Sequence, residues 1–573
     1  MGNKNNEPSN YQLSDKARNS SLYSEDLKPV PPNERTWGMW DLAAIWVGMA
    51  VCIPTYLLAS YMIKDGFSWV EAISIIAIGN ILVTIPMVLN GHAGLKYGVP
   101  FPVIGRSSFG VNGVHIASVL RGVVACGWFG IQTWIGGLAI YSIGCVLFGI
   151  ESSAGLSAGK FFGFALFWLM NVYFIWKGTE SIRWLETLAA PLLILIGIAM
   201  IWWGANNVGS FKEVLNRSAE LSVPTAVITS QTDQTVSLKL NPIRDKDGQT
   251  KANQYRLVSG ETQGSWIGLA SANDEVSYIL GDALTKVDKS SLQIQFQSIR
   301  GEKAVLSSPV NLTTAGDKKQ GSKIWKYLLW LTAMVGFWAT MAISIADITR
   351  FGKSQKEQAM GQFIGLPGTM VLYSFVGVFV TCAAAIIFGD VLVLEDAPWD
   401  PVSLVDKLDS PAVIIVAQIC MLIATLSTNI AANVIAPANA FSNILPRKIS
   451  FRSGGIITAI LGIIICPWWL LDSIAGLLLL VSSFLGPILA VIICDYYSLR
   501  KMEVSVNDLF LEKGAYTYSN GYHGAAFIAL LAGVAVALLG YLVPSMAILY
   551  NTSWFSSFIV AYLVYYFLAK RGD

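Results

Sequence analysis

The segment Arg121-Gly-Val-Val-Ala-Cys-Gly-Trp-Phe-Gly-Ile-Gln-Thr-Trp134 lies inside the apolar run 112–148, so Trp128, Gln132 and Trp134 are expected at membrane depth. Trp128 and Gln132 are four residues apart, and a helix therefore places them on one face, one turn apart. A flat aromatic ring beside an amide that donates and accepts hydrogen bonds suits a small, flat, polar ligand. A tryptophan that packs helices and a glutamine that bonds a neighbouring helix fit the same spacing.

Composition indicates an integral membrane protein. Of 573 residues, 54% are hydrophobic and only 13% are charged, against roughly 25% charged in soluble domains. Mean hydropathy is +0.54, and a net charge of +2 argues against a nucleic-acid partner. The seven cysteines lie in apolar runs without a CxxC pair, so the sequence suggests neither a disulfide framework nor a zinc site. The polar residues 1–35 contain no signal-peptide core and form an N-terminal tail.

About 20 apolar residues cross a membrane as a helix, and twelve such spans are expected. They are 39–63, 69–90, 112–148, 159–177, 184–204, 325–346, 362–388, 411–439, 452–471, 473–497, 523–543 and 546–569, with the ninth and tenth nearly fused at Asp472.

Lysine and arginine in short loops set the orientation, since they favour the cytoplasmic side. One side of the predicted bundle carries Lys96, Arg106, Lys177, Arg183, Arg350, Lys353, Lys356, Arg447, Lys448, Arg452, Arg500, Lys501, Lys513, Lys570 and Arg571. The other side carries few, and its loop 390–409 is acidic. We therefore expect a multi-pass protein of the inner (plasma) membrane with both termini in the cytoplasm.

Residues 205–322 are polar and lie on the predicted outer side. Strand-like runs, punctuated by Gly, Asn, Asp and Ser, predict a small β-rich extracytoplasmic domain inserted between spans five and six. These runs are 225–229, 235–240, 255–258, 265–269, 292–296 and 304–306. A long disordered loop is the alternative. The segment shows no metal or catalytic cluster, so an accessory or partner-binding role is favoured over ligand capture, and its partner is unknown.

Two spans carry signals of an interrupted helix, which is where transporters bind substrates and ions. In span one, Pro54 lacks an N–H and would free the carbonyl near Ala50. In span six, Gly336 and Thr340 could relax the helix. A simple proline kink and ordinary packing are the alternatives.

Span eight carries polar side chains of the kind that bind sodium or a polar ligand. Ser427 and Thr428 offer hydroxyl oxygens, and the amide of Asn433 follows further along. Serine and threonine also commonly bond back to their own helix, which is the alternative.

Acidic residues do not fall in the middle of any span; Asp347 and Asp495 lie at cytoplasmic span ends. A carboxylate proton relay is therefore not supported, and a neutral substrate with sodium held by carbonyls and hydroxyls fits better. No Ser-His-Asp, HExxH or phosphate-loop motif occurs, so we expect no enzymatic activity and no cofactor besides the coupling ion.

Several long motifs, in order, resemble the nucleobase:cation symporter-1 family of cytosine, uracil, allantoin and hydantoin permeases. They are Gly79-Asn80 with Pro86, Asn90-Gly-His-Ala-Gly94, Lys96-Tyr-Gly-Val-Pro-Phe-Pro-Val-Ile-Gly-Arg-Ser-Ser-Phe-Gly110, Gly127–Trp134, Glu186–Pro191, Trp338-Ala-Thr, Ile345-Ala-Asp-Ile-Thr-Arg350, Ser427-Thr428 with Asn433, and Gly486-Pro487 leading to Asp495-Tyr-Tyr497. The resemblance runs from about residue 36 to the C-terminus and leaves out only 205–322.

The resemblance implies an all-α LeuT-like fold of two inverted five-helix repeats plus two helices. Helices 1–5 would occupy 36–204, helices 6–10 would occupy 323–499, and helices 11–12 with a short tail would occupy 500–573.

The implied function is import of a planar heterocycle by sodium symport and alternating access. By motif matching, Trp128 and Trp338 would sandwich the ring, and Gln132 and Asn433 would hydrogen-bond its amide edges. A proton-coupled symporter of the same ligands, and a transporter-fold sensor signalling through the insertion, are the alternatives.

The resemblance also implies a sodium site between spans one and eight. Its ligands would be the carbonyls of Ala50, Ile53 and Ala424 and the hydroxyls of Ser427 and Thr428.

Overall fold

The computed structural model describes residues 13–570 apart from 153–154, 178, 218–224, 242–251, 261, 270–274, 288–290, 301–302, 307–309, 315–322, 389–400, 409 and 471–473. The side chains of 179–190 are also outside the description. The predicted junction at Asp472 and most of the predicted acidic loop 390–409 therefore lie outside the described residues.

Helices of the first half of the chain precede the strands. They are α1 (Asp15–Arg18), α2 (Met39–Ala50), α3 (Ile53–Lys64), α4 (Trp69–Tyr97), α5 (Phe101–Ile104), α6 (Arg106–Phe109), α7 (Val114–Phe148), α8 (Ala158–Lys177), α9 (Thr179–Val208) and α10 (Phe211–Arg217).

The second half adds the remaining helices. They are α11 (Lys323–Phe337), α12 (Ala339–Ser344), α13 (Ala346–Thr349), α14 (Gln355–Phe388), α15 (Pro401–Val405), α16 (Pro411–Asn433), α17 (Ile435–Ile444), α18 (Phe451–Ile464), α19 (Pro467–Leu470), α20 (Ile474–Ile493) with a π-helical extension (Cys494–Leu499), α21 (Val506–Leu509), α22 (Gly524–Leu542), α23 (Ala547–Asn551) and α24 (Ser553–Lys570).

Within the described residues, nine helices are long and apolar enough to cross a membrane, and two sharply bent pairs raise this number to as many as eleven. The expected span 452–471 coincides with the shorter apolar helix α18, of 14 residues. The helical fold of the membrane part is confirmed, whereas the count of twelve spans stays a prediction.

Two helix interruptions fall where the sequence predicts them. The pair α2 and α3 bends by 60°, and the extended Cys52 separates the two helices. Pro54 lies in the first turn of α3, where its missing N–H needs no partner. Between α11 and α12, Trp338 leaves the helical conformation, with φ −100° and ψ 5°.

Small residues let the helices approach closely, as is usual in membranes. A Cβ atom added to Gly336 would lie 2.2 Å from Ser482 Oγ of α20. A Cβ on Gly137 of α7 would lie 2.5 Å from the backbone of Phe164 in α8. Glycine is therefore required at both contacts.

The insertion folds into two small sheets. A four-stranded sheet has the order β10-β1-β2-β6, and in the second sheet β3 pairs with β4, β5 and β7, while β7 also pairs with β8 and β9. The strands are β1 (Thr225–Gln231), β2 (Thr235–Asn241), β3 (Gln254–Ser259), β4 (Thr262–Gln263), β5 (Ile267–Gly268), β6 (Glu275–Ile279), β7 (Gln293–Arg300), β8 (Lys303–Leu306), β9 (Val310–Asn311) and β10 (Thr313–Thr314).

All six strand-like runs of the sequence lie at strands, which confirms a β-rich insertion. Strand β6 was not predicted. It pairs with β2 at the end of its sheet, and Val276 and Tyr278 face the core, but the apolar Ile279 on the opposite face is exposed and blurs the alternation. Tyr278 packs with Tyr255, Leu257 and Phe296 in a core separate from that of the helices.

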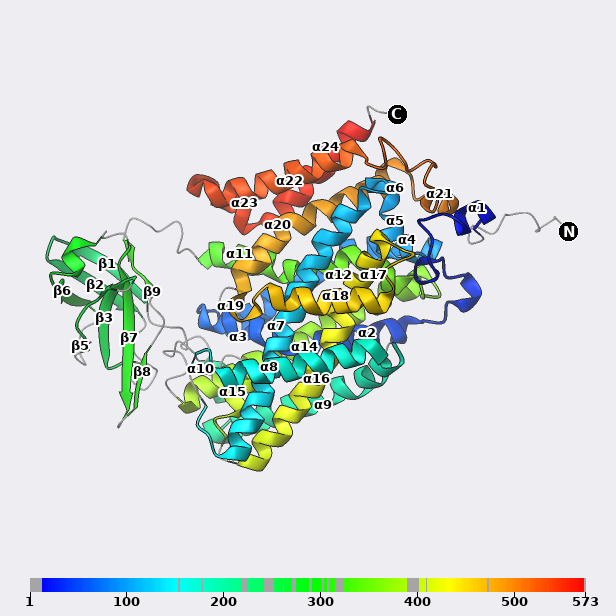
Figure 1. The fold of residues 1–573 in the computed structure, drawn as a ribbon. Coiled ribbons are helices and arrows are strands. Elements are labelled where there is room, and N and C mark those ends of the chain that lie inside the picture. The colour runs from blue at the N-terminus through cyan, green and yellow to red at the C-terminus, as the bar shows by residue number, and fades with distance from the viewer. Residues whose placement is uncertain are drawn as a thin grey trace.

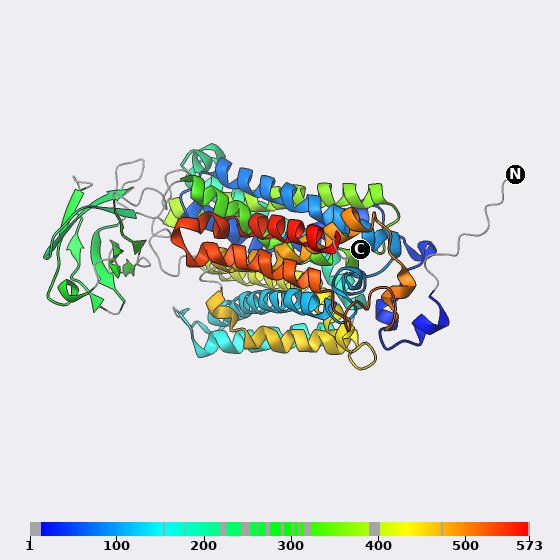
Figure 2. The ribbon, with the colours of Figure 1, turned by 90° about the horizontal axis from the view of Figure 1, so that it is seen from above.

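Both views place the sheets beyond one end of the helix bundle, and the N-terminal segment and the C-terminus at the other end (Figures 1 and 2). At the end with the termini, the buried Arg106 joins distant parts of the chain. Its guanidinium donates to the carbonyls of Leu509 (2.7 Å) and Leu22 (3.2 Å) and to Asn443 Oδ1 (2.6 Å).

Candidate functional site

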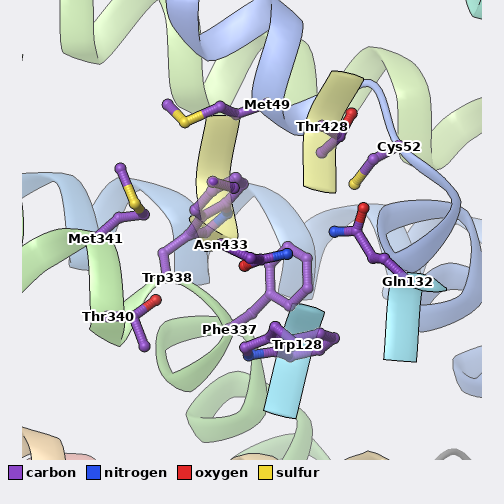
Figure 3. A pocket seen from close by; sticks show the side chains of 11 residues that line it. Met49, Cys52, Trp128, Gln132, Phe337, Trp338, Thr340, Met341, Thr428 and Asn433 are labelled. Carbon is purple, nitrogen blue, oxygen red and sulfur yellow. The ribbon is translucent and has the colours of Figure 1, made fainter. Parts of the chain in front are cut away.

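A cavity of about 30 Å³ lies where both interrupted helices meet α7 and α16 (Figure 3). Residues from α2, the α2–α3 break, α7, the end of α11, the α11–α12 break, α12 and α16 line it. They are Met49, Cys52, Trp128, Gln132, Phe337, Trp338, Thr340, Met341, Thr428, Ala432 and Asn433. The four residues predicted to bind substrate are therefore brought together, from positions up to 305 residues apart in the chain (433 minus 128).

Aromatic rings fill much of this cavity. Phe337 lies between the two indoles in the close view (Figure 3) and is edge-on to both. Its centroid is 5.2 Å from that of Trp128 at 89°, and 5.0 Å from that of Trp338 at 76°. Trp46 packs edge-on against Trp338, with ring centroids 5.3 Å apart and ring planes at 86°. Phe337 was not predicted, although its place directly before the helix interruption is a signal that could have found it.

Two polar atoms at the cavity are buried and have no hydrogen-bond partner among the described residues. They are Gln132 Oε1 and Trp338 Nε1. A buried polar atom without a partner costs about 1–3 kcal/mol, and a ligand that supplies the partner recovers that free energy. The cavity therefore offers unpaired acceptor and donor atoms beside aromatic faces, which is the chemistry of a binding site for a flat polar ring.

The residues predicted to bind sodium lie beside the cavity. Thr428 Oγ1 donates to Gly48 O over 3.3 Å, and this bond joins α16 to α2 just before the interruption. Ser427 Oγ is buried and has no partner among the described residues. Thr428 lines the cavity, whereas Ser427 does not.

The residues predicted to supply carbonyl ligands to sodium lie outside the cavity lining. Ala50, Ile53 and Ala424 are buried but do not line the cavity. The Ala50 carbonyl accepts a hydrogen bond from Cys52 N at 3.0 Å. Hydroxyl and carbonyl oxygens are the ligands that hard cations prefer, so Ser427 Oγ, unpartnered among the described residues, and the Thr428 hydroxyl fit a sodium ion.

Asp347 and Asp495 lie at span ends, as expected, but both are buried. Asp495 forms an ion pair with Arg500, with Nε and Oδ2 2.8 Å apart, and it accepts from Tyr565 at 2.9 Å. Asp347 Oδ1 accepts from Phe101 N at 2.8 Å, and burial raises the pKa of this carboxyl. Sequence periodicity gave no signal of this burial.

The model of the family described as "permease for cytosine/purines, uracil, thiamine, allantoin" matches residues 29–241 and 303–564. The chain belongs to this permease family. Its expected membership is confirmed, and the match is interrupted only over 242–302, well inside the predicted insertion.

Curated relatives of this permease include a purine-uracil permease of Arabidopsis thaliana, 33% identical over 96% of this chain and 78% of the relative. An allantoin permease of Bacillus subtilis is 31% identical over 96% of this chain and 94% of the relative. The matched relatives are thus transporters of planar heterocycles.

Among solved structures, the permease is similar to Mhp1, a nucleobase-cation-symport-1 family transporter in a closed conformation with bromovinylhydantoin bound. Identity is 22%, the TM-score is 0.65, and 96% of each chain is covered. The inward-facing conformation of Mhp1 matches with 23% identity and the same TM-score. The LeuT-like fold is therefore confirmed.

Proposed function

We propose that this permease imports a neutral planar heterocycle of the nucleobase, allantoin or hydantoin class by sodium symport and alternating access. The observation that carries the proposal is the pair of partnerless atoms, Gln132 Oε1 and Trp338 Nε1, at a cavity bounded by two indoles. The class of ligand also agrees with the purine-uracil and allantoin permeases among the relatives.

Binding requires a rearrangement of the aromatic rings. A cavity of about 30 Å³ has room for roughly two water molecules, which is too little for a heterocycle. Phe337 occupies the space between Trp128 and Trp338, so we expect its ring to move aside when a substrate enters. Each indole–ring contact would then add about 0.5–1.5 kcal/mol beyond area burial.

The proposed sodium ion lies between α2 and α16, with Ser427 and Thr428 as hydroxyl ligands. The Thr428–Gly48 hydrogen bond already joins these two helices. An ion at this place would stabilise the arrangement in which Trp128, Trp338 and Asn433 face one cavity. Substrate and ion would therefore raise each other's affinity by the same factor.

We also propose that both termini are cytoplasmic and that the sheets are outside the cell. Two observations support this proposal. Both termini lie at the same end of the molecule, and the loops at that end carry the positively charged residues.

The test is uptake of labelled uracil, cytosine, allantoin and benzylhydantoin into proteoliposomes, with separate inward gradients of sodium and protons. The proposal expects accumulation of at least one compound, driven by the sodium gradient. Accumulation driven only by protons would replace the coupling ion and keep the substrate class. Absence of uptake and of binding by folded protein would overturn the proposal and favour a sensor.

A further inference from the structure

Three buried asparagines form a chain of side-chain hydrogen bonds from α8 to the cavity. Asn171 Nδ2 donates to Phe167 O (2.8 Å), Asn429 Nδ2 donates to Asn171 Oδ1 (3.2 Å), and Asn433 Nδ2 donates to Asn429 Oδ1 (3.1 Å). Asn171 and Asn429 are fully buried. Apolar side chains of α7, α8 and α16 pack together in the same region. Polar side chains inside a membrane protein are costly and are generally retained for a function.

Backbone carbonyls fix the direction of this chain, because a carbonyl can only accept. Phe167 O requires the amino group of Asn171, which leaves the oxygen of Asn171 facing Asn429. The two hydrogens of Asn429 Nδ2 are shared among Asn171 Oδ1, Phe129 O (3.2 Å) and Thr133 Oγ1 (3.1 Å), so one of these bonds is bifurcated. Thr133 Oγ1 gives its own hydrogen to Phe129 O (2.7 Å). Turning the Asn429 amide over would set its oxygen against three acceptors.

Asn433 inherits this direction. Its amino group bonds Asn429, and its Oδ1 has no hydrogen bond to any described residue while the side chain lines the cavity (Figure 3). Gln132, by contrast, makes no side-chain hydrogen bond within the described part of the chain. Its amide is free to present either end, so the two amides that face the cavity differ in adaptability.

We propose that Asn171 and Asn429 are positioning residues that hold Asn433 as a hydrogen-bond acceptor, and that the substrate presents a ring N–H to it. This inference rests on the proposed function. It narrows the substrate class to lactams and imides, whose ring nitrogen carries a hydrogen beside a carbonyl. A ring nitrogen that is methylated, or that offers a lone pair, leaves Asn433 Oδ1 buried and unpaired.

The first test compares binding of uracil and hydantoin with binding of their N-methylated forms to the purified protein. The wild type is expected to prefer the N–H compounds roughly 10- to 100-fold, from the cost of an unpaired buried acceptor. In Asn429→Leu and Asn171→Leu, Asn433 can rotate, so this preference should fall about tenfold or more. A lost preference cannot arise from general destabilisation, which weakens both compounds alike.

Asn80→Leu is the matched control, because Asn80 is equally buried but bonds only its own helix, with Nδ2 donating to Ile76 O at 2.7 Å. It should keep the preference of the wild type. An unchanged preference in folded Asn429→Leu and Asn171→Leu proteins would overturn the inference.

A second test needs no substrate and separates this inference from the proposed function. In thermal unfolding, the double variant of Asn171→Leu and Asn429→Leu should lower Tm by less than the sum of the two single shifts, because the residues share a hydrogen bond. Additive shifts would overturn the proposed coupling of the asparagines. If the wild type binds no ring compound while the shifts are non-additive, the proposed function fails and the chain of hydrogen bonds stands as a structural link.

Discussion

Trp338 shows how one residue both shapes and lines the site. Its backbone interrupts the helix between α11 and α12, and its indole faces the cavity with an unpaired N–H. Trp128 contributes an indole from the middle of the unbroken α7. The two aromatic walls therefore come from elements of different kinds, one an interrupted helix and the other a continuous one.

Replacing either indole should abolish measurable substrate binding. Trp128→Ala and Trp338→Ala each remove an aromatic face, losing ring contact of about 0.5–1.5 kcal/mol beyond area burial and leaving the pocket oversized. Binding is measured by scintillation proximity with labelled substrate, and folding by size-exclusion chromatography. Trp554→Ala is the control, because Trp554 is similarly buried in α24 but remote from the cavity. Normal uptake by both cavity variants would contradict a binding site between the two indoles.

Thr428→Ala should weaken the sodium dependence of uptake selectively, by about tenfold in the half-saturating sodium concentration, since about 1.4 kcal/mol from one lost oxygen ligand is a factor of ten. Sodium titration of substrate uptake measures it. Thr458→Ala is a fair comparison, because the buried Thr458 bonds back to Gly454 O of its own helix (2.9 Å), contacts Cys126 of α7 and does not line the cavity. A sodium response equal to that of the wild type would place the ion elsewhere.

Residue spacing predicted the pair Trp128 and Gln132, because both lie on one turn of one helix. It did not predict the contact of Asn171 with Asn429, which lies 258 residues away in the chain. Such contacts depend on how α7, α8 and α16 pack, and a single sequence gives no measure of that packing.

At the scale of elements, the site depends on two helices that stop and restart. The chemistry of Pro54 made the first interruption predictable. The second was expected near Gly336, yet the residue that leaves the helix is Trp338. Gly336 instead allows α11 to approach α20. The glycine therefore marked the region of the interruption correctly, but it does not cause the interruption.

Gly336→Ala should therefore destabilise the protein by about 1–3 kcal/mol through overpacking, because the added Cβ meets Ser482 Oγ and the Leu478 carbonyl. The readout is the thermal unfolding midpoint in detergent. Gly144→Ala serves as the control, since nothing lies within 4 Å of its added Cβ. Equal midpoints for the two variants would show that the α11–α20 contact yields without cost.

At the scale of the whole molecule, the sheets form a core of their own, whereas α10 belongs to the helices. Phe211 of α10 stacks on Phe379 of α14 with centroids 4.6 Å apart. The boundary predicted at residue 205 therefore precedes a helix that packs with the bundle. The polarity of the segment located the insertion in the sequence, but the contacts of α10 determine where the sheet domain begins.

Replacing residues 218–322 by a flexible Gly/Ser linker should preserve transport if the insertion is accessory, because α10 and all cavity residues remain. Uptake by the deletion protein, normalised to folded protein, is the measurement. Loss of uptake by a correctly folded deletion would assign the sheets a part in transport.

Because the sheets and the termini lie at opposite ends, the orientation of each molecule in a membrane can be determined from which end is accessible. Reconstitution inserts transporters into vesicles in both directions, and flux then sums two unequal populations. A protease added outside would cut the sheet domain of one population and the terminal segments of the other. The fragment pattern would count each population, so that import and export rates could be assigned to separate faces of the same protein.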